Sequence, residues 1–336
     1  MTQKYIHLNK EADGSYGDGG ADSYTLFLKA GDISFNTEQD FAEIEEINRP
    51  TLEEAYPVAR TGGGSFSMWG RANALPLLLW GLFGGYNHVD VGSGGVAPYQ
   101  TNFIPDTPNL PSLEISEGAD NNEYGYPGQL IDNMEFTAEA GDVMGIDVET
   151  TGIAATTTRS KQTPVYIDPD TCPIFTLKNA TIDLGGSSRA DLRSLNVSIS
   201  NSISDDEHTL GSLDLQEKPP AQRREIEVEM EFKDEDSEIW QDFVDGTEAA
   251  LEATFQTDAE IEEGYPYELT FLFPRIQYRE TTMDQSGRDP IRTNVSGRAL
   301  FERGYEYDIG DGTTATADTE IIAQLVHGAA DQLDTA

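Results

Sequence analysis

Cysteine and histidine are scarce in this 336-residue chain, and their scarcity excludes several kinds of site. The single cysteine, Cys172, rules out an intramolecular disulfide and has no neighbours at metal-ligand spacing. None of the four histidines (His7, His88, His208 and His327) has a second His or Cys at the i, i+4 spacing of a helical zinc site. We therefore expect no metal site and expect the histidines to lie at the surface.

Motifs of enzymes and membrane segments are missing as well. The chain has neither a Gly-Lys-Ser/Thr phosphate loop nor a Gly-x-Ser-x-Gly nucleophile elbow. The calcium-loop-like start at 9–14 is followed by Gly20 where a bidentate Glu is required. The longest apolar stretch, 74–83, is about half a membrane span, and residues 1–10 do not resemble a signal peptide. We expect a cytoplasmically made protein with no enzyme activity, no cofactor and no membrane contact.

Positive charge is the third shortage, because 61 acidic residues face only 21 basic ones and the net charge is −40. Seven of the basic residues are Lys and fourteen are Arg, and they form no aromatic-interleaved patch. At low salt this charge would repel nucleic acid and other copies of the chain. In molar salt the Debye length falls to about 3 Å, so the composition indicates salt adaptation. The alternative interpretation, in which the acidic residues line one functional surface, stays open.

Alternating apolar and polar residues are frequent, which is typical of half-buried β-strands. The pattern predicts strands over 24–35, 65–69, 113–115, 134–138, 146–149, 175–184, 195–200, 225–232, 269–278 and 295–301. Helices are predicted over 74–83 after Asn73 and over 237–245 after Asp236 or Ser237, and a short one near 321–326. Residues 84–112, rich in Gly and Pro, are expected to form a long loop. The predicted fold class is mainly β.

The two halves of the chain resemble each other. Trp80 and Phe83 recur as Trp240 and Phe243, an offset of 160 residues in both cases. The same offset places Phe66 of the preceding strand on Ile226. We interpret this as an internal duplication. The alternative is that two strand–helix units arose from ordinary patterning.

The order of these elements resembles that of the long-chain tail tube (major tail) proteins of tailed viruses. Its motifs are a strand pair, Gly64-x-Phe66-x-Met68, the Leu-rich helix 75–83, the segment 126–128 (Tyr-Pro-Gly), the hairpin 134–148, and the strands and helix of the second half. The resemblance covers roughly residues 24–302, and its motifs are diffuse patterns of strand and turn. The acidic composition would then indicate a virus of halophilic archaea.

This resemblance implies packed β-sheets with a flanking short helix, and hairpins that join those of other chains in an inner β-barrel. We expect an N-terminal arm (1–22), two tail-tube-like β domains (23–156 and 157–302) and a C-terminal arm (303–336). Rings of three two-domain chains, or of six chains, would stack into a conduit for viral DNA in the virion tail. Other tail proteins would bind the tube ends, and assembly would take place in the host cytoplasm.

Two strands supply candidates for the inner surface of such a tube. One face of strand 225–232 is acidic and its other face is apolar, while strand 195–200 has a face of small polar residues. An acidic lumen would repel DNA phosphates, so DNA would pass without specific binding. The candidate lumen-facing residues are Glu225, Glu227, Glu229, Glu231, Asn196, Ser198 and Ser200.

Two other functions fit parts of the sequence. A different β-rich assembly or adhesion protein of a halophile, such as a spike or a surface-layer piece, would share the strands and the charge. An enzyme would need converging polar groups, which the motifs do not show. We expect a tail tube subunit.

Overall fold

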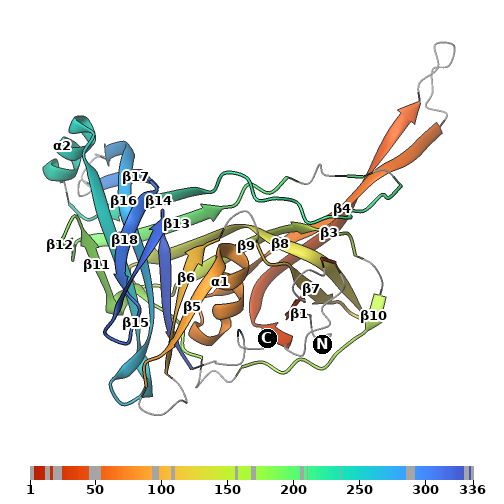
Figure 1. Cartoon of the computed structure of the whole chain (residues 1–336), viewed down its shortest axis with the longest axis horizontal. Coiled ribbons are helices and arrows are strands. Elements are labelled where there is room, and N and C mark those ends of the chain that lie inside the picture. Colours follow the sequence, from red (N-terminus) through yellow and green to blue (C-terminus); the bar gives the residue numbers. More distant parts are fainter. Residues whose placement is uncertain are drawn as a thin grey trace.

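The computed structural model describes residues 4–11, 16–17, 25–44, 54–92, 98–106, 110–155, 158–167, 172–204, 208–209, 211–234, 236–284, 292–328 and 333. Figure 1 shows large twisted antiparallel sheets and two short α-helices in this part of the chain, so the predicted mainly-β fold class is confirmed.

The strands and helices follow one another in three groups. The first group is β1 (Tyr5–Lys10), β2 (Thr25–Leu28), β3 (Ala30–Ile44), β4 (Glu54–Trp69), the 3-10 turn Ala72–Ala74, α1 (Pro76–Phe83), β5 (Gly84–Asp90), β6 (Tyr99–Pro105), β7 (Leu113–Gly118), β8 (Asn122–Glu139), β9 (Gly145–Gly152) and β10 (Thr158–Ser160). The second is the 3-10 turn Leu177–Asn179, β11 (Ala180–Leu184), β12 (Ser187–Ser188), β13 (Leu192–Ser200), β14 (Glu225–Phe232), α2 (Ser237–Asp245), β15 (Glu248–Glu262), β16 (Tyr265–Asp284) and β17 (Arg292–Ala299). The third is β18 (Glu302–Asp308), β19 (Thr314–Thr319) and β20 (Ile322–His327).

Eight of these strands form one continuous antiparallel sheet, which we call the main sheet. Its order is β3-β4-β9-β8-β13-β14-β17-β16. The alternation seen in the sequence decides which side chains are buried, because successive residues of a strand point to opposite faces. In β14, for example, Ile226, Val228, Met230 and Phe232 are buried while the glutamates between them are not.

The main sheet consists of two four-stranded units with the same strand order. The first unit is β3-β4-β9-β8 and the second is β13-β14-β17-β16. In each unit an α-helix follows the second strand along the chain. The units meet where β8 pairs with β13, from Asn133 opposite Ser200 to Glu139 opposite Ser194. The predicted domain boundaries inside the chain stay predictions.

The apolar face of the main sheet packs against α1 and a second layer of strands. The first part of β16 pairs with β15 and β20, and β20 continues through β6 to β5. The rings of Phe136 and Phe271 meet edge to face across the two layers, with centroids 4.9 Å apart. All eight residues of α1 are buried in this core, and α1 ends at Gly84, which has a φ of 86°.

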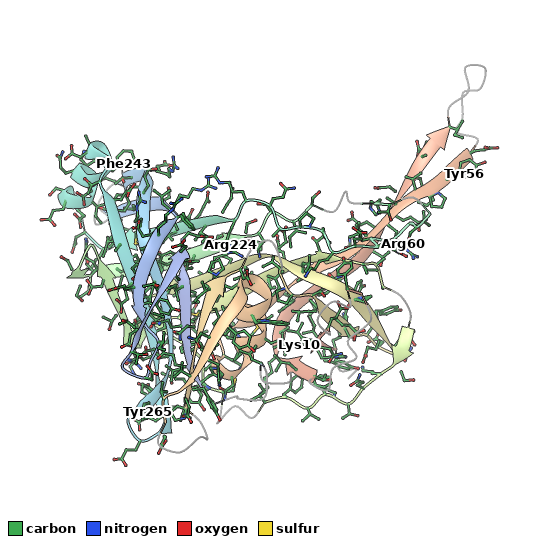
Figure 2. The ribbon with its side chains drawn as sticks, viewed as in Figure 1. Lys10, Tyr56, Arg60, Arg224, Phe243 and Tyr265 are labelled. Atoms are coloured by element: carbon green, nitrogen blue, oxygen red, sulfur yellow. The ribbon has the colours of Figure 1, made fainter. Side chains whose placement is uncertain are left out.

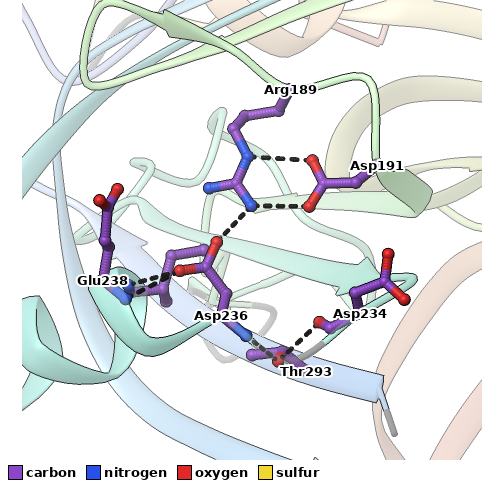
Figure 3. Close-up of polar contacts among 7 residues, drawn as sticks. Arg189, Asp191, Asp234, Asp236, Glu238 and Thr293 are labelled. Atoms are coloured by element: carbon purple, nitrogen blue, oxygen red, sulfur yellow. Dashed lines mark hydrogen bonds and ion pairs between the residues drawn. The ribbon is translucent and has the colours of Figure 1, made fainter. Parts of the chain in front are cut away.

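Helix α2 is held at its start by a polar network rather than by burial (Figure 3). The side chain of Asp236 accepts hydrogen bonds from the backbone N–H groups of Glu238 and Ile239, which caps the helix. Arg189 forms ion pairs with Asp236 and with Asp191, at 2.8 Å for the latter. Ile239 is the buried residue of this helix.

A long hairpin of β3 and β4 projects from the body, with Tyr56 in its outer part (Figures 1 and 2). Its root pairs with β9, while its outer part has Phe41, Ile44, Tyr56 and Val58 exposed. Arg60 anchors the segment after β13 to the hairpin through a 2.6 Å ion pair with Asp214.

Several sequence-based expectations are wrong. The expected loop over 84–112 contains β5 and β6, because β20 supplies a partner for β6. The expected helix near 321–326 is strand β20, since so short a helix is marginal and two neighbouring strands satisfy its backbone. Residues 5–10 of the expected N-terminal arm form the buried strand β1, which lies between β2 and β7.

Two histidines expected at the surface are buried. His7 Nε2 lies 3.2 Å from Glu123 Oε1, and the Tyr5 hydroxyl donates to the same carboxylate at 2.5 Å. His327 Nε2 lies 2.8 Å from the hydroxyl oxygen of Thr101. Burial is tolerated because each imidazole has a polar partner from a strand far away in the sequence.

Candidate functional site

The candidate site is the face of the main sheet opposite the core, which we call the polar face. Its residues alternate with the buried core residues along seven strands. They are Ser65, Ser67, Asn133, Glu135, Thr137, Glu139, Asp147, Glu149, Ser194, Asn196, Ser198, Ser200, Glu225, Glu227, Glu229, Glu231, Gln277, Glu280, Thr282, Arg292, Asn294, Ser296 and Arg298.

All seven candidate lumen-facing residues lie on the polar face. Strands β13 and β14 are neighbours, and their register places Asn196 opposite Glu229, Ser198 opposite Glu227 and Ser200 opposite Glu225. Glu231, the seventh, lies opposite Ser194. The sheet therefore brings these side chains together in two adjacent rows. Their orientation toward a lumen stays a prediction.

The neighbours that complete the polar face are not among the residues predicted from the sequence. Glu135 lies opposite Ser198 on one side of the two rows, and Arg298 lies opposite Glu227 on the other. Asp147 and Glu149 extend the face onto β9. The period-two pattern over 134–138 and 146–149 had already predicted those strands. Their polar residues could have been assigned to a face with the same rule.

Hydrogen bonds and ion pairs fix part of the polar face. The Asn196 amide donates to Glu135 Oε1 at 2.6 Å. Arg292 from β17 forms a 2.9 Å ion pair with Glu231. Arg298, also from β17, pairs with Glu225, and this hydrogen bond lowers the pKa of that carboxyl. Two arginines of one strand thus compensate two of the four glutamates of β14.

Carboxylates elsewhere on the polar face lie close to one another. Glu135 is directly opposite Asp147 in the β8–β9 pair. Partial burial and then the negative charge of Glu135 raise the pKa of Asp147. Like charges that face each other across a strand pair are unfavourable unless a cation or salt screens them. This arrangement favours a role in which the face stays wet and anionic.

The polar face is hollowed at two places. A depression of about 410 Å³ lies between β8, β13, β14, β17 and β16, with Glu139, Asn196, Glu229, Glu231 and Glu280 in its wall. A second of about 230 Å³ is lined by Glu135, Asn196, Ser198, Glu227 and Glu229. Such a surface repels phosphates. Neither wall contains a Cys or a His.

Among the described residues no three His, Cys, Asp or Glu side chains converge as a metal site would require. Neither described helix is long and apolar enough to cross a membrane.

A family model described as "Phage tail tube protein" matches residues 3–299. No curated protein matches the chain.

Proposed function

The chain belongs to the phage tail tube protein family, and from this premise we propose how it forms a tube. As a member it is a structural subunit of the virion tail that self-assembles. Our proposal is that three chains close each ring, that rings stack, and that the polar face lines the channel through which viral DNA passes.

The observation that carries this proposal is the open main sheet. Among the described residues, β3 pairs with β4 alone, and β16 beyond Gln277 pairs with β17 alone. The sheet therefore ends in unpaired stretches at both sides. Exposed edges of this kind pair with other strands unless something covers them, and closure into a barrel removes them. Joining β16 of one chain to β3 of the next would close such a barrel.

The two units of each chain support the proposed number of chains. Inside one chain, the last strand of the first unit, β8, pairs with the first strand of the second, β13. The corresponding strands between chains are β16 and β3. If three chains are joined in this way, their six units form a ring with pseudo-sixfold symmetry. Six chains would instead give twelve units around a wider channel.

The polar face supports the channel role through its charge. Glu225, Glu227, Glu229 and Glu231 and the acids beside them would face the DNA, and their negative charge opposes tight binding. At a net charge of −40, close packing of subunits favours a salt-rich medium, consistent with a virus of halophilic archaea. We include assembly in the host cytoplasm, contacts with other tail proteins at the tube ends, and the absence of catalysis in the proposal.

The test is the symmetry of one ring. Purified chain in molar salt should form rings or hollow tubes in electron micrographs, and averaged end-on views should show three repeats of two lobes each. Native mass spectrometry of rings should give three chains of 36.8 kDa. Rings of six chains would contradict the proposed stoichiometry. Folded monomers alone at high concentration would contradict the tube.

A further inference from the structure

Helices α1 and α2 occupy the same place in their units but differ in exposure. In α1, Phe83 is fully buried and Trp80 is 6% exposed. In α2, Trp240 is 42% and Val244 is 59% exposed, while Phe243 is half-buried. Trp240 and Phe243 lie 6.1 Å apart by ring centroids, so α2 presents an apolar surface of three side chains. We call Trp240, Phe243 and Val244 the α2 patch.

The second unit covers the C-terminal end of α1. The Asn201 amide donates to the carbonyl oxygen of Leu82 at 3.1 Å, and Arg224 donates to the same oxygen at 3.3 Å. The Arg224 guanidinium also lies 5.8 Å from the centre of the Phe83 ring. Asn201 and Arg224 directly follow β13 and directly precede β14. The start and the end of the β13–β14 connection therefore cover the helix of the neighbouring unit.

The corresponding connection in the first unit is the outer part of the β3–β4 hairpin. It has no counterpart of α1 beside it in its own chain, since Figure 2 shows Tyr56 of the hairpin and Phe243 of α2 at opposite ends of the molecule. The hairpin nevertheless carries exposed apolar side chains, with Phe41 at 53%, Tyr56 at 52% and Val58 at 49% exposure. Exposed apolar patches at both ends of one molecule favour head-to-tail contacts between copies.

We propose that, where β16 of one chain joins β3 of the next, the β3–β4 hairpin of that next chain packs on the α2 patch of the first chain. The contact repeats between chains what the β13–β14 connection does to α1 within a chain. It is heterologous, so it propagates around a ring and closes when the rotation allows. The inference rests on the proposed ring, and it names the partner surface as α2 of a second copy.

Charge makes this contact dependent on salt. The hairpin carries exposed Glu38, Asp40 and Glu43, and α2 carries exposed Glu238 and Asp245. These acids repel each other at low ionic strength. At about 1 M salt the Debye length is about 3 Å, so the repulsion is screened while the apolar contact remains. Docking should therefore strengthen as salt is raised.

Cysteine cross-linking tests the contact directly. The native Cys172 does not interfere, because its burial raises the pKa of its thiol and keeps it unreactive. Val58→Cys and Val244→Cys proteins are mixed in molar salt and treated with a short bismaleimide. We expect a 58–244 heterodimer, identified by peptide mass. The matched control replaces Val244→Cys by Val165→Cys, at an even more exposed valine (77%) outside α2. Equal yields in the two mixtures would overturn the docking.

A charge variant supplies the second measurement. Val244→Asp should weaken ring formation about tenfold or more, because it places a charge in the apolar contact. Val165→Asp places the same charge at an exposed valine outside α2 and should have little effect. If the unsubstituted chain forms no rings in the same buffer, the ring proposal itself fails. If rings form without the 58–244 link, and Val244→Asp behaves like Val165→Asp, only the docking inference fails.

Discussion

The two four-stranded units share a strand order but stabilise their helices differently. Helix α1 starts after Leu75, which offers no side-chain acceptor, and all its residues are buried. Helix α2 starts after Asp236, which accepts two backbone hydrogen bonds, and much of α2 is exposed. Packing therefore stabilises the first helix, whereas local polar contacts stabilise the second. Two helices at corresponding positions can therefore contribute differently to the free energy of unfolding.

The largest expected effect is at the corresponding residues Phe83 and Phe243. Phe83→Ala should lower the free energy of unfolding by about 3–5 kcal/mol, because it opens a cavity in the core. Phe243→Ala should cost only about 1 kcal/mol, because its ring is half-buried. Urea unfolding of both variants in the same high-salt buffer measures the difference. Equal losses would mean that α2 is packed as tightly as α1, and would break the comparison.

Strand β20 pairs with β16 of the second unit and with β6, which follows the helix of the first, so it ties the two together. Burial and then the neighbouring His88 lower the pKa of its His327 to about 3. An unfolded histidine has a pKa of about 6.5, so below that pH the unfolded state binds a proton that the folded state does not. Stability should fall by about 1.4 kcal/mol per pH unit, or about 2–3 kcal/mol between pH 6.5 and 4.5.

The control for this prediction is His327→Gln, which removes the titrating group. Its free energy of unfolding at pH 6.5 will differ from that of the unsubstituted chain because Thr101 loses its imidazole partner. The informative quantity is the slope between pH 6.5 and 4.5, which should be shallower in the variant by about one proton. Identical slopes would show that protonation of His327 does not cause the loss of stability at acid pH.

Much of the main sheet could be predicted from the sequence, because local periodicity fixes which side of a strand each residue takes. The segments 195–200 and 225–232 alternate cleanly, so their polar residues were assigned to one face, and the structure places them on one face. Their neighbours were not predicted. Strand pairing between β13 and β8 joins residues about 60 positions apart, and nothing in the local pattern encodes that partner.

The failures have the same physical origin. The burial of His7 depends on Glu123, which is shared with Tyr5. Tyr5 is close to His7 in the sequence, but Glu123 is more than 100 positions away. The expected loop 84–112 contains β6, whose partner β20 lies more than 200 positions later in the sequence. In each case a partner that is distant in the sequence, rather than local propensity, decides the outcome. Burial of charge is thus harder to predict than strand alternation.

The smallest effect concerns the cap that distinguishes α2 from α1. Asp236→Ala removes the acceptor for the Glu238 and Ile239 N–H groups and one partner of Arg189 (Figure 3). We expect a loss of about 1–2 kcal/mol, measured by urea unfolding. Asp236→Asn keeps an acceptor for the cap but loses the charge that faces Arg189. Because Arg189 retains Asp191 at 2.8 Å, this variant should lose less than Asp236→Ala. Equal losses in the two variants would show that the ion pair with Arg189, and not the helix cap, provides the stabilisation. Helix α2 would then depend on its contact with the β12–β13 connection rather than on its own first turn.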